Sequence, residues 1–397
     1  MEPKPLVVQF GAGAIGRGFL GDLWTQGSRE VLFLDVDPTL ISLLNTKGAY
    51  PLRITGEGMS QRQVGPVRGA LVTDTAAVSE GLAVCEFACT AVGVNAFSRL
   101  APTLADGIAH RVRQGTANLA PLNIICCENQ KEAGALLRAA VAVHLPKDAD
   151  IRAYFDRRVA FVDASVGRMV PPPTDALLKE DALLILAESY ADLPIDGNAW
   201  IGPVPPIPGL FPKTNFTGYV ARKLFTHNGG HALLAYEGYR RGHEFIWQAA
   251  EDAELIAELR GYWDETGAAL IRTYGFEASE QRAHETDLLK RFRNRALGDT
   301  IRRVGRDVAR KVRPDDRLVG AALLCDTQGI EPVFACRAIA AAYAYDASGD
   351  PTAPEIQKVI RSEGIHAALN RFSQIGKDSP LADRIAAEYA TMGSARP

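Results

Sequence analysis

Three glycines near the start of the chain follow a short apolar run in the spacing Gly-X-Gly-X-X-Gly, and this pattern restricts the fold strongly. The run Leu6–Phe10 predicts a strand, and Gly11, Gly13 and Gly16 open a helix that continues to about Gln26. In such a turn the first glycine permits the bend, the second lets a pyrophosphate approach the backbone, and the third lets helix and strand pack closely. The alternative is a purely structural turn. We predict a dinucleotide-binding turn made by Gly11, Ala12, Gly13, Ala14, Ile15 and Gly16.

A carboxylate follows at the distance that such a turn requires. Asp35 ends the predicted strand Val31–Asp35, nineteen residues after Gly16. A carboxylate there accepts hydrogen bonds from the ribose hydroxyls and repels a 2′-phosphate. No arginine follows it in Val36-Asp37-Pro38. The sequence therefore predicts NAD rather than NADP as the cofactor.

The rest of the first half alternates strand-like and helical stretches. Apolar runs separated by helices are typical of a mostly parallel, doubly wound sheet covered on both faces. Further strands are predicted at Leu82–Cys89, Leu122–Cys127 and Val159–Asp163, with helices at Phe97–Gln114 and Lys131–His144.

Ligands bind at the carboxyl ends of strands in such sheets, and two loops are predicted there. The loop Thr90-Ala-Val-Gly93 is expected to line the nicotinamide side, with Thr90 and Val92 as cofactor contacts. Asn129 follows the strand Leu122–Cys127 and is a candidate hydrogen-bond donor to the substrate. Its alternative is a turn or N-cap residue before a helix that starts at Lys131.

The second half changes character after a proline-rich segment. Residues 202–212 hold five prolines in eleven residues, and we expect such a segment neither to continue a helix nor to sit inside a sheet. We predict an NAD-binding Rossmann-type domain at 1–200, a connector at 201–212 and a mainly α-helical substrate domain at 213–397, with the active site in the cleft between the domains. Helices are predicted at Thr217–Arg241, Phe245–Tyr274, Ala283–Arg293, Thr300–Val312, Glu331–Tyr345 and Pro380–Ala390.

The first of these helices carries the residues best suited to chemistry. At about 100° per residue, Asn228 lies ~140° and His231 ~80° around from Lys223, so the three share one broad face. Gly229 and Gly230 each cost a helix about 1 kcal/mol relative to alanine, which is expected if something flat approaches the backbone there. The alternative is a surface helix with two tolerated glycines.

These side chains suit proton transfer at a secondary alcohol. A lysine with a lowered pKa takes the hydroxyl proton while a hydride leaves for the nicotinamide, and amides stabilise the developing oxyanion. His227 and His231 have the spacing of a zinc helix, but Asn228 stands where the HExxH motif has its glutamate. We expect no metal.

A basic segment supplies cations for a phosphate. Residues 290–317 hold eleven Lys or Arg against four Asp, +7 in a chain of net charge −3. Most such residues belong to solvated helix faces. Arg303 and Lys311, then Arg293 or Arg295, are expected to turn inward.

Composition limits the remaining classes. With 47% apolar and 23% charged residues, the chain is typical of a soluble protein. Its charge gives no global reason to expect nucleic acid or a membrane surface. The start shows no signal peptide, and the six cysteines form no CxxC pair or disulfide framework, so we expect reduced thiols and a cytoplasmic location. A monomer or small homo-oligomer is expected.

Together these motifs resemble the polyol-specific long-chain dehydrogenases, the mannitol dehydrogenase family. The resemblance covers about residues 6–345. It rests on GAGAIGRGFLG, TAVG, CEN, FVDASVGRMVPP (161–172), RKLFTHNGGHALLAYEG (222–238), TGAALIRTYGF (266–276) and RRVGRDVARKV (302–312).

The resemblance implies a role for each matching residue. Lys223 would be the general acid/base, Asn129 and Asn228 the oxyanion donors, His231 a substrate contact, and Arg303 and Lys311 further substrate-binding residues, without zinc. Two positions depart from the family pattern. Gly167 replaces an aspartate linked to proton traffic, and Arg295 replaces a proline, which could add a phosphate contact.

The resemblance implies NAD-dependent interconversion of D-mannitol 1-phosphate and D-fructose 6-phosphate, with the hydride leaving C5. A sugar or polyol phosphate is thus the expected small-molecule partner. The alternatives are a related oxidoreductase acting on an unphosphorylated polyol or hexuronate and, from another class, a catalytically silent NAD-binding sensor.

Overall fold

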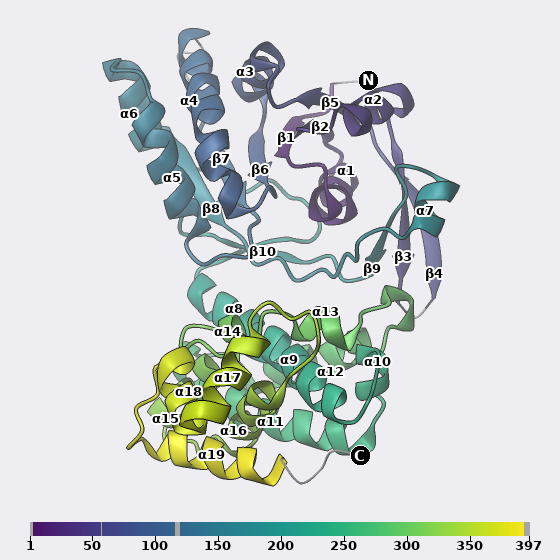
Figure 1. Cartoon of the computed structure of the whole chain (residues 1–397). Helices are drawn as coiled ribbons and strands as arrows, with labels where there is room; N and C mark the ends of the chain where they lie inside the picture. Colours follow the sequence, from purple (N-terminus) through teal and green to yellow (C-terminus); the bar gives the residue numbers. More distant parts are fainter. Residues whose placement is uncertain (1–2, 57, 116–119, 393–397) are drawn as a thin grey trace. The chain divides into compact units, whose positions relative to one another are not determined.

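The computed structural model describes residues 3–56, 58–115 and 120–392 (Figure 1). The chain divides into two compact units, unit 1 ending at Tyr219 and unit 2 beginning at Val220. No helix among the described residues is both long and apolar enough to cross a membrane.

Unit 1 is built on a six-stranded sheet in the order β5-β2-β1-β6-β7-β8, in which every neighbouring pair is parallel. The order reverses between β1 and β6, so the carboxyl ends of these two strands flank the position where a doubly wound sheet binds its ligand. The strands of this sheet are β1 (Leu6–Phe10), β2 (Glu30–Asp35), β5 (Val67–Leu71), β6 (Phe87–Thr90), β7 (Leu122–Cys126) and β8 (Val159–Asp163).

Both faces of the sheet are buried because its strands are continuous apolar runs. Neighbours along β1 point to opposite sides, so Val7 joins one core and Val8 the other. The core of Val8 is covered by the helices α3 (Thr75–Val84), α4 (Phe97–Arg113), α5 (Ala133–His144) and α6 (Ala149–Arg158) (Figure 1). The core of Val7 is covered by η1 (Gly16–Gly21), α1 (Asp22–Gln26), α2 (Pro38–Lys47) and residues of two smaller sheets.

The smaller sheets place the proline-rich segment. In the three-stranded sheet, β3 (Tyr50–Thr55) pairs antiparallel with β4 (Met59–Val64) and parallel with β9 (Ile185–Glu188). In the two-stranded sheet, β10 (Leu193–Asp196) pairs with β11 (Leu210–Lys213), which contains Pro212. The expectation that these prolines stay outside any sheet is therefore wrong at Pro212. A two-stranded ribbon has only edge strands, and a proline is tolerated there.

Unit 2 is helical and centred on α9 (Gly229–Arg240), whose Leu233, Leu234 and Tyr236 are buried. Along the chain α9 is preceded directly by η3 (Lys223–Asn228), and η3 by α8 (Phe216–Arg222). The boundary between the units falls within α8. The other helices of unit 2 are α10 (Ile246–Ala249), α11 (Ala253–Tyr274), α12 (Ala278–Phe292), α13 (Ile301–Gly305), α14 (Val308–Lys311), α15 (Val319–Thr327), α16 (Val333–Ala344), α17 (Ala353–Glu363), α18 (Ile365–Ser373) and α19 (Pro380–Met392). Two short 3₁₀ turns, η2 (Val94–Ala96) and η4 (Arg295–Leu297), and α7 (Asp175–Glu180) complete the named elements.

Three predicted elements differ in the structure. The stretch Leu82–Cys89 is not one strand, because its first residues end α3 and only Phe87 onward forms β6. The helix predicted at Phe245–Tyr274 breaks before Asp252, whose side chain caps the N-terminus of α11. The helix predicted at Thr300–Val312 breaks at Asp307, which has a positive φ of 64°.

Candidate active site

The glycine turn has room for a phosphate at one glycine. A Cβ added to Gly11 would lie 2.4 Å from the Ala91 carbonyl oxygen, and one on Gly16 would lie 2.0 Å from the Gly11 carbonyl oxygen. A Cβ on Gly13 would meet nothing within 4 Å. The fold itself therefore requires Gly11 and Gly16, whereas Gly13 borders open space, as a bound pyrophosphate would need. The turn fits the phosphates of a dinucleotide.

Asp35 is fixed beside this turn at the end of β2. Its Oδ2 accepts the Ala12 N–H at 2.6 Å, and its Oδ1 accepts the Val36 N–H at 2.7 Å. The side chain is only half-buried. Asp35 Oδ1 also accepts the Asp37 N–H at 3.2 Å. Since a carboxylate has about four lone-pair sites, acceptor capacity remains for one further donor such as a ribose hydroxyl.

A second carboxylate, which the sequence did not single out, holds the predicted nicotinamide loop. Glu128 is buried two residues after the end of β7 and accepts the Val92 N–H at 3.0 Å and the Gly93 N–H at 2.8 Å. Val92 also lies against Gly11, because its Cγ1 is 3.2 Å from where a Cβ on Gly11 would stand. Thr90, by contrast, is fully buried inside β6.

Asn129 follows Glu128 and is exposed. The alternative that it caps the next helix is wrong, because α5 begins at Ala133 and its N-cap residue is Glu132. Asn129 lies instead in a bend at the carboxyl end of β7, the edge of the sheet from which ligand contacts come.

Lys223 and Asn228 begin and end a π-helical turn, η3. The Gly229 N–H bonds the Leu224 carbonyl, which is the i→i+5 pattern. Residues five apart come close to one another in rotation in such a turn, so the ~140° predicted between Lys223 and Asn228 for a regular α-helix does not hold. π-Helical turns occur frequently at functional sites.

The environment of Lys223 favours its neutral form. Burial is the largest cause that lowers the pKa of Lys223, to about 8, and the positive charges of Arg317 and Arg310 add to it, against the opposing carboxylate of Asp316. A lysine with a pKa near the working pH exchanges a proton readily in both directions.

His231 lies one turn further along α9. Its Nε2 is 3.0 Å from Asp299 Oδ2, a close ion-pair distance without the alignment of a hydrogen bond. Its ring stacks on Phe292, with centroids 4.9 Å apart. Arg303 forms a second close ion pair with the same carboxylate. One buried aspartate therefore lies against two of the three predicted substrate-contacting side chains, His231 and Arg303.

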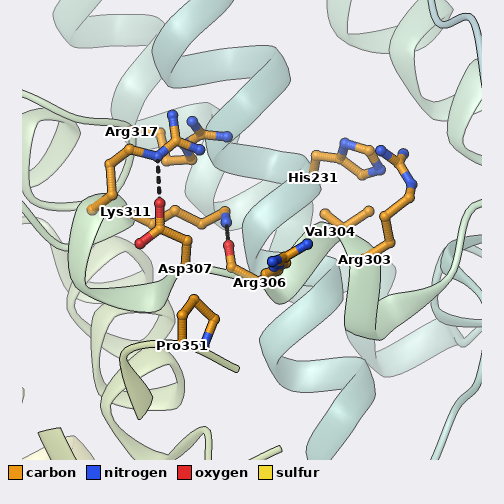
Figure 2. Close-up of a pocket in the computed structure, with 9 residues that line it drawn as sticks. His231, Arg303, Val304, Arg306, Asp307, Lys311, Arg317 and Pro351 are labelled. Carbon is orange, nitrogen blue, oxygen red and sulfur yellow. Dashed lines mark hydrogen bonds and ion pairs between the residues drawn. The ribbon is translucent and has the colours of Figure 1, made fainter. Parts of the chain in front are cut away.

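A cavity of about 460 Å³ opens beside His231 (Figure 2). Its cations lie on α13 and α14 and on the segments that follow each of these helices, so they come from both sides of the break at Asp307. Its lining residues are His231, Arg303, Val304, Arg306, Asp307, Arg310, Lys311, Arg317 and Pro351. Five Lys or Arg line the cavity with one Asp, and three of them pair with carboxylates: Arg303 with Asp299, Arg310 with Asp307 and Arg317 with Asp316. The lining therefore carries more positive than negative charge, which suits an anion.

Lys311 is the buried cation of this cavity. Its ammonium contacts the Arg306 carbonyl oxygen (Figure 2). Burial is the largest cause that lowers the pKa of Lys311, to about 7, and Arg317 and Arg310 lower it further. The structure therefore places both predicted residues, Arg303 and Lys311, in the cavity together with Arg306, Arg310 and Arg317.

The other two candidate arginines lie elsewhere. Arg293 donates to the Ala250 carbonyl at 2.9 Å. Arg295 pairs with Glu251 at 2.9 Å and lies over the Trp247 ring, 4.2 Å from its centroid. Neither lines the cavity, so the expectation that one of them turns inward is wrong. Gly167 is the other position that departs from the family pattern, and a Cβ added to it would lie 3.1 Å from the Tyr190 ring.

His227 is buried, with its ring 5.7 Å from Phe292 and 6.1 Å from His231. Burial lowers the pKa of His227 well below its usual value, and Arg291 adds to this effect. Across the described ranges, no three His, Cys, Asp or Glu side chains form a cluster that could hold a metal ion.

Sequence reasoning missed Glu128, Asp299 and three arginines of the cavity as candidate residues. Glu128 had one visible signal, its place at the carboxyl end of a predicted strand. Asp299 and the arginines had none beyond the charge of their segment, because which of these side chains turn inward depends on the helix break at Asp307.

Comparison with known proteins agrees with this arrangement. The Rossmann-domain model of mannitol dehydrogenase matches residues 5–209, and the model of its C-terminal domain matches residues 215–393. Similar solved structures include the Pseudomonas fluorescens mannitol 2-dehydrogenase in complex with NAD and D-mannitol, 18% identical with a TM-score of 0.75 over 99% of this chain and 92% of that one. A D-sorbitol dehydrogenase in substrate-free form is 17% identical with a TM-score of 0.83, over 100% and 95%. The chain belongs to the mannitol dehydrogenase family.

Proposed function

We propose that this chain interconverts D-mannitol 1-phosphate and D-fructose 6-phosphate with NAD, the activity of a mannitol-1-phosphate 5-dehydrogenase. The observation that carries the proposal is the cavity beside His231, where five Lys or Arg surround a space of about 460 Å³. A polyol alone offers such a cavity only hydroxyl groups, whereas a phosphate dianion offers it charge.

The chemistry needs one proton and one hydride to leave the alcohol. NAD supplies the hydride acceptor for C5. Lys223, whose pKa is lowered to about 8 by burial and by Arg317 and Arg310, takes the hydroxyl proton as the carbonyl forms. Asn228 is proposed to donate to the oxygen as its negative charge develops, the role that the family resemblance also gives to Asn129.

The phosphate end is proposed to bind the arginines that close the cavity. Arg306 and Arg310 belong to the two sides of the break at Asp307, and Arg317 follows on the next segment. Guanidinium groups match phosphate oxygens in a fork geometry. Arg310 already pairs with Asp307 at 3.1 Å. A bound phosphate therefore competes with the Asp307 carboxylate for the Arg310 guanidinium.

An unphosphorylated substrate is the second candidate. The solved structures of similar fold include a mannitol 2-dehydrogenase with D-mannitol and a D-sorbitol dehydrogenase. At 17–18% identity these structures support the shared fold. The cation-rich cavity of this chain favours the phosphorylated substrate.

Initial rates of NADH oxidation with D-fructose 6-phosphate and with D-fructose separate the two candidates. We expect kcat/KM to favour the phosphate by about 100-fold or more, the value of one or two charge-assisted hydrogen bonds. Arg310→Gln should reduce that preference. Arg313→Gln is the matched control, because Arg313 is exposed, pairs with Asp315 and does not line the cavity. Equal or better activity with free fructose would establish the second candidate instead.

A further inference from the structure

The π-helical turn that carries Lys223 and Asn228 is held by two aromatic side chains of α11. The Tyr262 hydroxyl lies 3.0 Å from the Phe225 carbonyl oxygen, and the Trp263 indole N–H donates to the Thr226 carbonyl oxygen at 2.9 Å. Both carbonyls belong to η3. In an α-helix each of these carbonyls would accept a hydrogen bond from the N–H four residues later. In a π turn a carbonyl accepts from the N–H five residues later instead. The Gly229 N–H also bonds the Thr226 carbonyl, so the aromatic donors add bonds from outside the helix to two carbonyls of the turn.

The two glycines after the turn make room for these donors. Gly229 stands four residues after Phe225, and a Cβ there would lie 2.1 Å from the Tyr262 hydroxyl oxygen. Gly230 stands four residues after Thr226, and a Cβ there would lie 2.9 Å from Trp263 Nε1. The flat groups that the paired glycines led us to expect are therefore the rings of Tyr262 and Trp263.

The same arrangement occurs independently in unit 1. There the Tyr50 hydroxyl donates to the Arg17 carbonyl at 2.7 Å, inside the π-helical segment η1. Gly21 stands four residues after Arg17, and a Cβ on it would lie 2.5 Å from the Tyr50 hydroxyl oxygen. A tyrosine hydroxyl on carbonyl i with a glycine at i+4 thus accompanies both π-helical segments.

Tyr262 also connects the turn to the charges around Lys223. Its hydroxyl lies 3.1 Å from the Arg317 carbonyl oxygen, so a single buried group spans the π turn and the segment of Arg317. The charged groups that act on Lys223 are Arg317, Asp316 and Arg310. Moving either segment changes the distances between those groups and the lysine.

We propose that Tyr262 and Trp263 are positioning residues for the reaction: by holding the Phe225 and Thr226 carbonyls they keep Lys223–Asn228 in its π-helical form, and so fix the lysine relative to Asn228 and His231. The proposal rests on the proposed role of Lys223 in hydride transfer. Neither aromatic residue touches the reacting atoms in this role. The glycine pair is required because the donors must reach the helix backbone.

The test compares Tyr262→Phe and Trp263→Phe with Tyr343→Phe. The control removes another buried hydroxyl of unit 2, that of Tyr343 in α16, which lies 2.6 Å from Ser373 Oγ at the end of α18. We expect each α11 variant to lower kcat with D-fructose 6-phosphate about tenfold, as for one lost buried hydrogen bond, with less than about a twofold change in KM. Thermal melts followed by far-UV circular dichroism report the folding of the helical unit 2 in every variant.

The pH profile distinguishes positioning from lost stability. Without its tether the lysine gains water, so the ascending limb of the oxidation profile should move to higher pH in the α11 variants. In Tyr343→Phe it should stay in place even if the Tm falls. A wild-type profile and kcat in both α11 variants would overturn the proposal. Full activity of Lys223→Ala would instead overturn the proposed function on which it rests.

Discussion

His231 and Asp299 are 3.0 Å apart, Nε2 to Oδ2, and the same carboxylate holds Arg303. Burial alone would raise the pKa of Asp299, but His231 and Arg303 outweigh it and hold that pKa below its usual range. Asp299 is therefore ionised at neutral pH, and both of the residues it contacts line the cavity.

Asp299→Asn keeps the shape of the side chain and removes the negative charge that faces His231 and Arg303. We expect kcat/KM for the phosphorylated substrate to fall about tenfold, through KM more than through kcat, as for one lost charge-assisted contact. Steady-state kinetics measure this. Asp315→Asn, in an exposed pair with Arg313, is the control and should behave as wild type. An unchanged KM in Asp299→Asn would show that this carboxylate does not organise the substrate site.

Alanine at two glycines of the cofactor turn should affect different properties: NADH affinity at Gly13 and stability at Gly16. In Gly13→Ala the new methyl group meets nothing within 4 Å, so the Tm should stay within about 1 °C while the Kd for NADH rises roughly tenfold or more. In Gly16→Ala the methyl group falls 2.0 Å from a backbone oxygen, which should cost roughly 3 kcal/mol or more of stability. Thermal melts with NADH titration measure both. Unchanged NADH binding in a folded Gly13→Ala protein would contradict the assignment.

Lys311 should make phosphate recognition depend on pH. With its pKa lowered to about 7, Lys311 is charged below that pH and loses its charge above it. We therefore expect kcat/KM for D-fructose 6-phosphate to decline as pH rises through 7. The substrate phosphate cannot cause a decline there, since it becomes dianionic near pH 6. A pH profile of kcat/KM checks this, and Lys311→Met should remove the decline near pH 7 and leave only the later fall near pH 8 that Lys223 causes.

The same shift predicts a gain in stability for Lys311→Met. The folded-state pKa lies below that of the unfolded chain, so the unfolded state binds more protons and wild-type stability rises with pH between about 7 and 10.5. The buried ammonium thus costs folding free energy on the order of a few kcal/mol at pH 7. The Tm of Lys311→Met should exceed that of wild type at pH 6 and 7, and the difference should shrink at higher pH. A lower Tm at pH 6 would contradict this sign.

Lys223 should impose opposite pH dependences on the two directions. Polyol oxidation needs the neutral amine, so kcat should rise with pH through about 8. Ketone reduction needs the ammonium, so kcat should fall over the same range. Profiles of kcat in both directions test this, and the absence of any titration between pH 7 and 9 would argue against the lysine as acid/base.

The Rossmann architecture could be predicted because its signals are local. The glycine spacing, the strand before it and Asp35 all lie within thirty residues, and each reflects the backbone it occupies. The apolar stretch Leu82–Cys89 shows the limit, because periodicity alone does not separate the end of a helix from the start of a strand in a short apolar run.

The candidate site was less predictable because tertiary contacts shape it. The π turn at Lys223 depends on donors from Tyr262 and Trp263, about forty residues away. The break that directs the cations inward depends on Asp307, whose N–H is bonded by Asp350 at 2.6 Å. The residue types of the site were readable from the sequence, whereas the rotation of the helix and the set of inward arginines were not.

The most direct measurement is the activity of Lys223→Ala with NADH and D-fructose 6-phosphate, with thermal melts as the measure of folding and NADH binding as the measure of an intact cofactor site. Removal of a general acid/base should lower kcat by about 10²–10⁴-fold while the Kd for NADH stays near the wild-type value, because the cofactor turn belongs to unit 1. Activity within a few-fold of wild type would contradict the assignment of Lys223 and the mechanism built on it.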